Sequence, residues 1–295
     1  MKKILITGAN SYIGCSFRQY AMQHYAADFS IDTMDVRGDA WRQKDFKGYD
    51  CILHVAGIAH ADVGRVSEKE KEAYYQVNTN LAIAVAEKAK AEGVGQFILM
   101  SSMIIYGGAK RITKEIEPKP SNFYGDSKWQ ADQAIRALAA ENFAVTVLRP
   151  PMVYGKGCKG NYQVIAKYAR TAPIFPEVMN ERSMLYIENL CEFLCVVIKE
   201  QRAGIFFPQN KELVNTCEMV KEIAKVNGHQ LCTISWLKPF VAIGRKMPGK
   251  IGELCQKAFG SSYYELEMSE YDFEYRVVDF QESVRRTEEK VRDRE

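Results

Sequence analysis

The sequence predicts an α/β protein in which a doubly wound parallel sheet is followed by a smaller α/β region. Three observations support this. Short apolar segments alternate with longer segments of helical periodicity up to about residue 150, as in successive βαβ units. A glycine turn joins the first apolar segment to the first helix. After about residue 157, the alternation gives way to isolated helices and short strands.

The predicted elements follow in order along the chain. Strands are expected at 2–7, 29–34, 51–55, 96–100 and 144–149, and helices at 12–26, 69–91 and 124–141. A short additional strand is expected at Asp39 and Ala40. Further helices are expected near 161–170, 189–199 and 215–227, and strands near 205–207 and 231–235. This divides the chain into domains at 1–157 and 158–295. The last 15 residues carry ten charges and are expected to form a solvated helix or a frayed end.

Composition and charge restrict the class of protein. With 47% hydrophobic residues, the chain can bury a full core. The net charge is +3 and charges of both signs are interspersed, so we expect neither a nucleic-acid footprint nor a membrane-binding face. The first strand directly follows Met1 and no apolar run could span a bilayer, so we expect a cytoplasmic protein without a signal peptide.

The cysteines and histidines show no metal-binding spacing. Eight cysteines are scattered without a Cys-x-x-Cys pair. Cys191 and Cys195, four residues apart in an apolar helical segment, are expected in the core. The four histidines, at 24, 54, 60 and 229, are also dispersed. We therefore expect no bound metal.

The turn after the first predicted strand suits a pyrophosphate. Gly8 permits a tight turn, Gly14 permits close packing of helix on strand, and the free N–H groups at the helix start face the phosphates. Ser11 stands where such turns usually have a middle glycine. Its side chain must point away from the ligand or hydrogen-bond to it. The turn therefore predicts a bound dinucleotide, with one departure from the usual pattern.

The end of the second strand indicates which dinucleotide binds. Asp35 lies 21 residues after Gly14, where a carboxylate can bind the adenosine ribose hydroxyls. This favours NAD. Arg37 lies two residues further on and could instead meet the 2′-phosphate of NADP, so NADP stays open.

Ser102, Tyr124 and Lys128 supply a hydroxyl donor, an acid/base and a cation. Hydride can leave or reach a carbon bearing oxygen only if a proton moves on that oxygen, and a phenol can move it. Free tyrosine titrates near about 10, and an ammonium within roughly 6 Å favours the phenolate. Lys128 lies one helical turn after Tyr124 on the same face. The three residues predict redox chemistry at a carbinol carbon.

Together these segments resemble the extended short-chain dehydrogenase/reductases, in particular the nucleotide-sugar epimerase/dehydratase group. The resemblance covers nearly the whole chain, and further matching segments appear in family order at 50–57, 77–81, 97–107, 148–155 and 181–190. It implies a Rossmann-type sheet interleaved with a substrate domain. It also implies a homodimer formed through the helices at 69–91 and 124–141, although their apolar stripe could equally be intramolecular core.

The resemblance also implies roles for individual residues. Tyr124, Lys128 and Ser102 would be catalytic. Residues expected at the cofactor are Gly8, Asn10, Ser11, Tyr12, Ile13, Gly14, Asp35, Arg37, Asp39, Ala40, His54, Ala56, Gly57, Asn78, Ser101, Tyr124, Lys128, Pro151 and Val153. Residues expected at the substrate are Ser102, Tyr154, Asn161 and Arg182. The planar guanidinium of Arg182 suits the nucleotide diphosphate because it can engage two oxygens at once.

The activity that the resemblance implies is C4 epimerisation of a UDP-hexose through a transient 4-keto sugar. The alternative is an NAD(P)H-dependent 4-ketoreductase of a UDP-4-keto-6-deoxy or amino sugar in surface polysaccharide synthesis. Dehydratases of this group usually carry Asp-Glu after the catalytic threonine. Met103 and Ile104 occupy those places, so dehydration is disfavoured. A dinucleotide-binding module without catalysis is a third reading, but such proteins typically lose the tyrosine or lysine present here.

Overall fold

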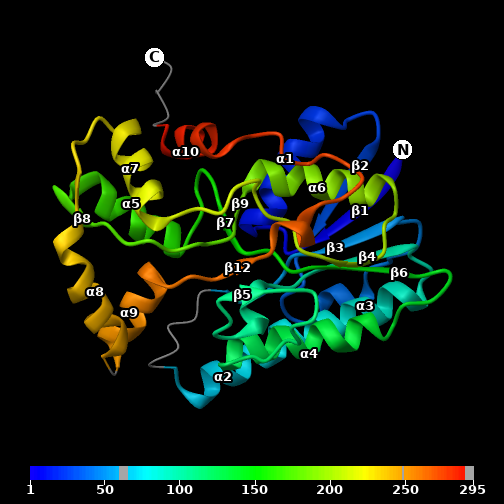
Figure 1. The fold of residues 1–295 in the computed structure, drawn as a ribbon. Coiled ribbons are helices and arrows are strands. Elements are labelled where there is room, and N and C mark those ends of the chain that lie inside the picture. The colour runs from blue at the N-terminus through cyan, green and yellow to red at the C-terminus, as the bar shows by residue number, and fades with distance from the viewer. Residues whose placement is uncertain (60–65, 248, 290–295) are drawn as a thin grey trace.

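The computed structural model describes residues 1–59, 66–247 and 249–289, and its centre is a six-stranded parallel sheet (Figure 1). The strands are β1 (Lys2–Thr7), β2 (Phe29–Met34), β3 (Cys51–His54), β4 (Gln96–Met100), β6 (Ala144–Leu148) and β10 (Gly204–Phe206). They lie in the order β10-β6-β4-β3-β1-β2, and each neighbouring pair is parallel. The predicted doubly wound parallel sheet is confirmed.

Successive side chains of β1 show why helices cover both faces of the sheet. Ile4 belongs to a buried cluster shared with α1 and α6, whereas Leu5 belongs to one shared with α3 and α4. Because neighbouring residues of a strand point to opposite faces, an apolar run needs cover on both. These helices are α1 (Tyr12–His24), α3 (Ala82–Ala91), α4 (Phe123–Arg136) and α6 (Ile187–Lys199). Cys191 and Cys195 of α6 are buried, as predicted.

The other long elements belong mainly to a smaller region. Its helices are α5 (Asn161–Thr171), α7 (Thr216–Val226), α8 (Lys238–Lys246), α9 (Lys250–Phe259) and α10 (Phe280–Glu288). Parallel strand pairs are β7 (Met152–Tyr154) with β9 (Met184–Tyr186), β8 (Ile174–Pro176) with β11 (Cys232–Ile234), and β5 (Arg111–Ile112) with β12 (Tyr263–Tyr264). Because β10 and α6 join the central sheet, the two regions interleave, and a single boundary after residue 157 stays a prediction. Among the described helices, none has the length and apolarity needed to cross a bilayer.

The strand predicted at Asp39 and Ala40 is wrong. A 3₁₀ helix, η1 (Ala40–Gln43), stands there, and β2 forms the edge of the central sheet. Gly38 has a φ of +66°, which turns the chain out of an extended path. Trp41 is then buried. Burial of the Trp41 indole, and not pairing with a strand, therefore accounts for the conformation of this segment.

The helix predicted over 69–91 is interrupted by a π-helical stretch. It consists of α2 (Glu68–Tyr74), the π-helix η2 (Tyr75–Leu81) and then α3. Ser67 begins it with a capping box: its Oγ accepts from Glu70 N at 3.3 Å, and the Glu70 carboxylate accepts from Ser67 N at 2.8 Å. Short π-helical stretches occur frequently at functional sites. The periodicity of the sequence alone does not reveal this one.

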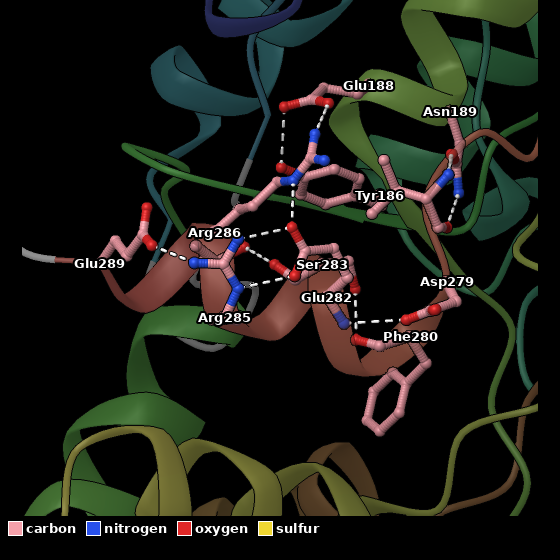
Figure 2. A network of polar contacts seen from close by, with 12 residues as sticks. Tyr186, Glu188, Asn189, Asp279, Phe280, Glu282, Ser283, Arg285, Arg286 and Glu289 are labelled. Atoms are coloured by element: carbon pink, nitrogen blue, oxygen red, sulfur yellow. Dashed lines mark hydrogen bonds and ion pairs between the residues drawn. The ribbon is translucent and has the colours of Figure 1, made fainter.

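The charged C-terminal helix α10 is only partly solvated. Val284 and Glu288 are buried, and the Glu288 carboxylate accepts from Tyr162 Oη at 2.9 Å. Figure 2 shows the other side of α10, where Arg286 donates to Glu188 at the start of α6 at 2.6 Å. The helix therefore ties the smaller region to the central one. The rest of the predicted charged end, 290–295, lies outside the described residues.

Candidate active site

The structure brings Ser102, Tyr124 and Lys128 together near the end of β4. Ser102 lies two residues after β4, and Tyr124 and Lys128 lie in the first two turns of α4. The helix α4 begins here because the Asn122 side chain caps it, accepting from Gly125 N at 2.9 Å. Ser102 lies close enough to Tyr124 to lower the pKa of its phenol. The predicted hydroxyl donor and phenol are therefore neighbours.

Tyr124 is half-buried and holds its proton at neutral pH. Burial raises the pKa of Tyr124 to about 12, and the nearby Ser102 hydroxyl opposes this rise only in part. The ring of Tyr74 meets the ring of Tyr124 edge-on, with centroids 5.9 Å apart. The hydroxyl is therefore a competent proton donor to a substrate oxygen in this arrangement.

Lys128 is almost fully buried, with 9% of its surface exposed. Its Nζ donates to the carbonyl of Met100 at 3.1 Å, and burial lowers the pKa of Lys128 to about 8. A Cβ on Gly57 would lie 3.1 Å from this Nζ, so the chain passes close to the ammonium. The sequence predicts an ammonium that favours the Tyr124 phenolate. In the structure, burial outweighs any such effect on the Tyr124 pKa.

Asn78, in the π-helix η2, hydrogen-bonds both to α4 and to the segment after β3. Its Nδ2 donates to the Ile58 carbonyl at 3.0 Å and to Ser127 Oγ at 3.2 Å, and its Oδ1 accepts from Ile58 N at 2.8 Å. Ser127 Oγ in turn donates to the carbonyl of Tyr124 at 2.8 Å. Asn78 therefore positions the helical turn that carries the phenol.

The turn after β1 has no room for a side chain at Gly8. Its φ is +101°, and a Cβ there would lie 2.7 Å from Ala56 N. At Gly14, a Cβ would lie 2.7 Å from Ser11 Oγ. Ser11 caps α1, with its Oγ accepting from Gly14 N at 3.0 Å. The departure from a middle glycine is thus accommodated by a helix cap.

The surroundings of this turn fit a dinucleotide. The adjacent parallel strands β1 and β3 end at Thr7 and His54. Gly8 directly follows β1 and Gly57 lies three residues after β3, so each strand is followed by a glycine that leaves space beside the backbone. The N-terminus of α1, with no acidic residue in its first turn, adds a favourable potential for phosphate. Burial lowers the pKa of His54 to about 3, so this imidazole stays neutral. Its Nδ1 lies 2.8 Å from Thr7 Oγ1.

Asp35, directly after β2, is bound by Arg37. The carboxylate accepts from Arg37 N at 2.9 Å and from Arg37 Nε at 2.9 and 3.0 Å. Hydrogen bonding by Arg37 lowers the pKa of Asp35 to about 2. Asp35 and Arg37 therefore bind each other at one site. The carboxylate would favour NAD, and the guanidinium would favour NADP.

The residues predicted on the substrate side differ in exposure. Tyr154 is fully buried, with its Oη 2.5 Å from Ser283 Oγ and accepting from Asn210 Nδ2 at 3.1 Å. These bonds give Tyr154 a packing role. Asn161 is exposed at the first position of α5. The predicted cofactor residues near the same segment, Pro151 and Val153, are buried and half-buried, and their contacts with a ligand stay predictions.

Arg182 is half-buried and linked through the backbone to the side of the site that carries Ser102. It forms bridges with Val214 and Ser262, and burial lowers its pKa. Ser262 Oγ donates to Met103 Sδ at 3.6 Å, next to Ser102 in the sequence. Binding of a diphosphate by Arg182 stays a prediction that this connection supports.

A buried ion pair behind Ser102 is absent from the sequence prediction. Asp132 and Arg149 are 0% and 4% exposed and hydrogen-bond to each other. Asp132 also accepts from Ser101 Oγ at 2.9 Å, and Arg149 donates to Tyr106 Oη at 2.7 Å. Asp132 lies four residues after Lys128, a spacing that places both on one helix face and could have revealed it. No local signal pairs it with Arg149.

The fold and this site define a dinucleotide-binding enzyme with a serine, tyrosine and lysine set near the end of its central sheet. The chain belongs to the NAD dependent epimerase/dehydratase family, whose model matches residues 4–206. It is therefore an NAD(P)-dependent enzyme of the extended short-chain dehydrogenase/reductase type, as the sequence resemblance implies.

Two curated relatives match most of the chain. The UDP-glucose 4-epimerase of Vibrio cholerae is 28% identical over 250 residues, covering 76% of this chain and 75% of the relative. The N-acetyl-alpha-D-glucosaminyl-diphospho-ditrans,octacis-undecaprenol 4-epimerase of Escherichia coli O157:H7 is 25% identical over 283 residues, covering 88% and 82%. Both relatives are named as 4-epimerases.

Solved structures share the fold at lower identity. A dTDP-4-dehydrorhamnose reductase from Clostridium acetobutylicum superposes with a TM-score of 0.72 at 19% identity, covering 97% of this chain and 98% of that one. A UDP-glucuronic acid 4-epimerase from Bacillus cereus, in complex with NAD, has a TM-score of 0.65 at 16% identity, covering 88% and 94%. Epimerases and reductases thus share one architecture.

Proposed function

We propose that the protein catalyses C4 epimerisation of a UDP-hexose through a transient 4-keto sugar. The observation that carries the proposal is the assembled set of Ser102, Tyr124 and Lys128 in a chain whose two long-matching relatives are 4-epimerases. The reaction needs proton transfer on one sugar oxygen in both directions. A phenol with a second hydroxyl beside it suits that task.

Ser102 and Tyr124 would both address the C4 oxygen of the sugar. Ser102 donates to this oxygen and stabilises its developing charge. Tyr124 takes the proton when the ketone forms and gives it back when the alcohol is restored. With its pKa at about 12, the return step is the favourable one for Tyr124. Lys128, with a pKa of about 8, is mostly charged at neutral pH and favours the phenolate in the first step.

The proposed cofactor site is made of residues from the turn after β1, the start of α1 and the end of β2. Bound NAD would supply the hydride acceptor for the C4 carbon and return the hydride to either face of the keto sugar. Gly8, Gly14 and the N-terminus of α1 would hold its pyrophosphate, and Asp35 its adenosine ribose. An epimerase of this kind uses the cofactor without net consumption.

Arg182 would bind the diphosphate of the substrate. A diphosphate is shared by UDP-hexoses and by the polyprenyl-linked sugar for which the Escherichia coli relative is named. The proposal therefore specifies the reacting sugar carbon and the diphosphate. It specifies less sharply whether the diphosphate is linked to uridine or to a polyprenyl group.

Product analysis by NMR tests the proposal. The purified protein is mixed with UDP-glucose and with UDP-N-acetylglucosamine and a catalytic trace of NAD, and C4 epimers are expected. Tyr124→Phe should abolish turnover while NAD still binds by calorimetry. Retained turnover in this variant would remove Tyr124 from the mechanism. No product from a protein that binds NAD would favour the 4-ketoreductase alternative, whose keto-sugar substrate is missing from these mixtures.

A further inference from the structure

The helix α8 and the short 3₁₀ helix before it, η4 (Ser235–Leu237), carry an exposed apolar stripe. Trp236, Phe240, Ile243 and Met247 are 67%, 63%, 62% and 43% exposed. Phe240 and Ile243, three residues apart, share a face of α8. Trp236 in η4 and Met247 at the C-terminal cap of α8 continue the exposed apolar row at either end. The rings of Trp236 and Phe240 meet edge-on, with centroids 6.2 Å apart. We call these four residues the α8 stripe. Scattered exposed apolar residues are normal on proteins, but a contiguous row of them marks an interaction surface.

A side of α8 adjacent to the stripe packs on α9, and the stripe itself stays exposed on this helical hairpin. Gly244 is buried, and a Cβ there would lie 2.9 Å from Cys255 Sγ of α9. The two helices are thus in close contact on this side. Figure 1 shows α8 and α9 at the end of the molecule remote from the central sheet. The hairpin can therefore meet a flat surface without moving the core.

The segment that carries the stripe is basic. Residues 236–257 include one acidic residue, Glu253, and five basic ones, which are Lys238, Arg245, Lys246, Lys250 and Lys257. Lys246 is exposed, and Lys238 pairs with Glu177 at 3.1 Å. A segment rich in lysine and arginine that also exposes aromatic and aliphatic residues is typical of helices that lie in the interface of an anionic bilayer. Pairing with a second copy would instead bring like charges together.

The hairpin is connected to the proposed diphosphate side of the site. The chain leaves α9 at Phe259 and reaches Ser262 three residues later, where it bridges Arg182. The residue Asn180, close to Arg182 in the sequence, donates from Nδ2 to the carbonyl of Gly260 at 3.2 Å. A surface docked on α8 would therefore lie on the same part of the molecule as the proposed diphosphate site.

We propose that the α8 stripe docks the protein on an anionic phospholipid surface, where its site takes a sugar diphosphate carried by a membrane lipid. For the sugar chemistry, this rests on the proposed 4-epimerase function. It departs from the sequence expectation of no membrane-binding face. That expectation followed from charges interspersed over the whole chain, whereas the stripe is confined to one helix.

Vesicle flotation of the full chain tests the docking. Wild-type protein should float with vesicles of mixed phosphatidylcholine and phosphatidylglycerol, and poorly with phosphatidylcholine alone. The variant Phe240→Ser/Ile243→Ser should bind at least about tenfold more weakly, because each side chain contributes its apolar burial. Met22→Ser on α1, at 60% exposure, is the matched control and should bind like the wild type. Lys246→Glu should weaken binding most at low salt.

Several results would overturn the docking proposal. One is a wild-type protein that does not float with the vesicles that contain phosphatidylglycerol. Another is a folded stripe variant that floats like the wild type. A stripe variant that only converts a dimer to a monomer would show that a second copy covers the stripe. Unfolding midpoints confirm that each variant is folded.

Turnover separates this proposal from the proposed function. The stripe variant should epimerise soluble UDP-sugars at the wild-type rate, and lose rate only on a polyprenyl-diphosphate sugar held in vesicles. Vesicle binding without any epimerisation would leave docking intact and remove the proposed function. Epimerisation of soluble substrates without vesicle binding would leave the proposed function intact and remove the docking proposal.

Discussion

Asp132 binds Arg149 through both carboxylate oxygens, at 2.8 and 2.9 Å, with both side chains almost fully buried. Asp132 belongs to α4, the helix of Tyr124 and Lys128, and Arg149 directly follows β6. The pair therefore joins α4 to the central sheet. Ser101, next to Ser102, donates to the same carboxylate at 2.9 Å. The positions of the two proposed catalytic hydroxyls, on Ser102 and Tyr124, are thus coupled to one buried charge pair.

Asp132→Asn should destabilise the fold by about 3–5 kcal/mol, because it leaves the Arg149 guanidinium buried without its counter-charge. Urea unfolding monitored by tryptophan fluorescence measures the change. Arg136→Gln is the control, since Arg136 donates to the same Asp132 at 2.9 Å but is 36% exposed. That substitution should cost less than about 1 kcal/mol. Equal losses in the two variants would contradict the role given to the buried pair.

Gly8→Ala should cost more stability than Gly48→Ala, although both glycines have positive φ, +101° and +79°. An alanine at Gly48 meets open space and suffers only the left-handed backbone penalty of about 1–2 kcal/mol. An alanine at Gly8 also meets Ala56 N at 2.7 Å, which adds about 1–3 kcal/mol. Unfolding in urea gives both values. Similar losses would mean that the turn after β1 can move away from β3.

Lys128→Met should change how stability depends on pH. Burial lowers the pKa of Lys128 to about 8, against about 10.4 in the unfolded chain. Between these values the unfolded chain binds a proton that the folded chain does not, so the cost of burying Lys128 is relieved as pH rises. The stability difference between variant and wild type should thus shift against the variant from about pH 8 to pH 10. Comparing the two proteins cancels the other titrating groups. A difference that stays constant would show that Lys128 keeps an ordinary pKa.

Arg37→Ala should raise the preference for NAD over NADP by about tenfold or more, because it frees the Asp35 carboxylate and removes the cation that would meet a 2′-phosphate. Calorimetric titration with each dinucleotide measures this. The pKa of Asp35, held at about 2 by Arg37, should rise toward its ordinary value. Arg42→Ala is the matched control, since Arg42 pairs with Asp39 at 3.1 Å on the neighbouring 3₁₀ helix. An unchanged preference in Arg37→Ala would show that the Asp35 and Arg37 pair does not select the cofactor.

The central sheet and the phosphate turn could be predicted because their signals are local. β3 and β4 are buried along their whole length, so continuous apolar runs identify them. The need for glycine at Gly8 follows from backbone geometry at one residue. The Tyr124 and Lys128 spacing is likewise readable from one helix. Features that depend on a few adjacent residues leave a pattern in the sequence.

The wrong and missing predictions concern tertiary contacts. Trp41 converts an expected strand into a 3₁₀ helix because its indole is buried. Tyr154, whose expected contact with the substrate stays a prediction, bonds to Ser283, 129 residues away along the chain, and the sequence did not indicate this bond. Asp132 and Arg149 pair across two elements, and the helices α8 and α9 are absent from the predicted elements. The partners of these residues are known only once the chain is folded.

The π-helical stretch over 75–81 takes up more chain than an α-helix of the same number of turns. A π turn closes an i→i+5 hydrogen bond where an α turn closes i→i+4, so it holds about one extra residue while the flanking helices keep their faces. Removing one residue here would leave Val85 and Ala89 of α3 facing the core, because the stretch can close as a regular α-helix. The change would fall on Asn78, whose side chain would no longer be directed at Ile58. The extra residue thus serves the proposed site and not the core.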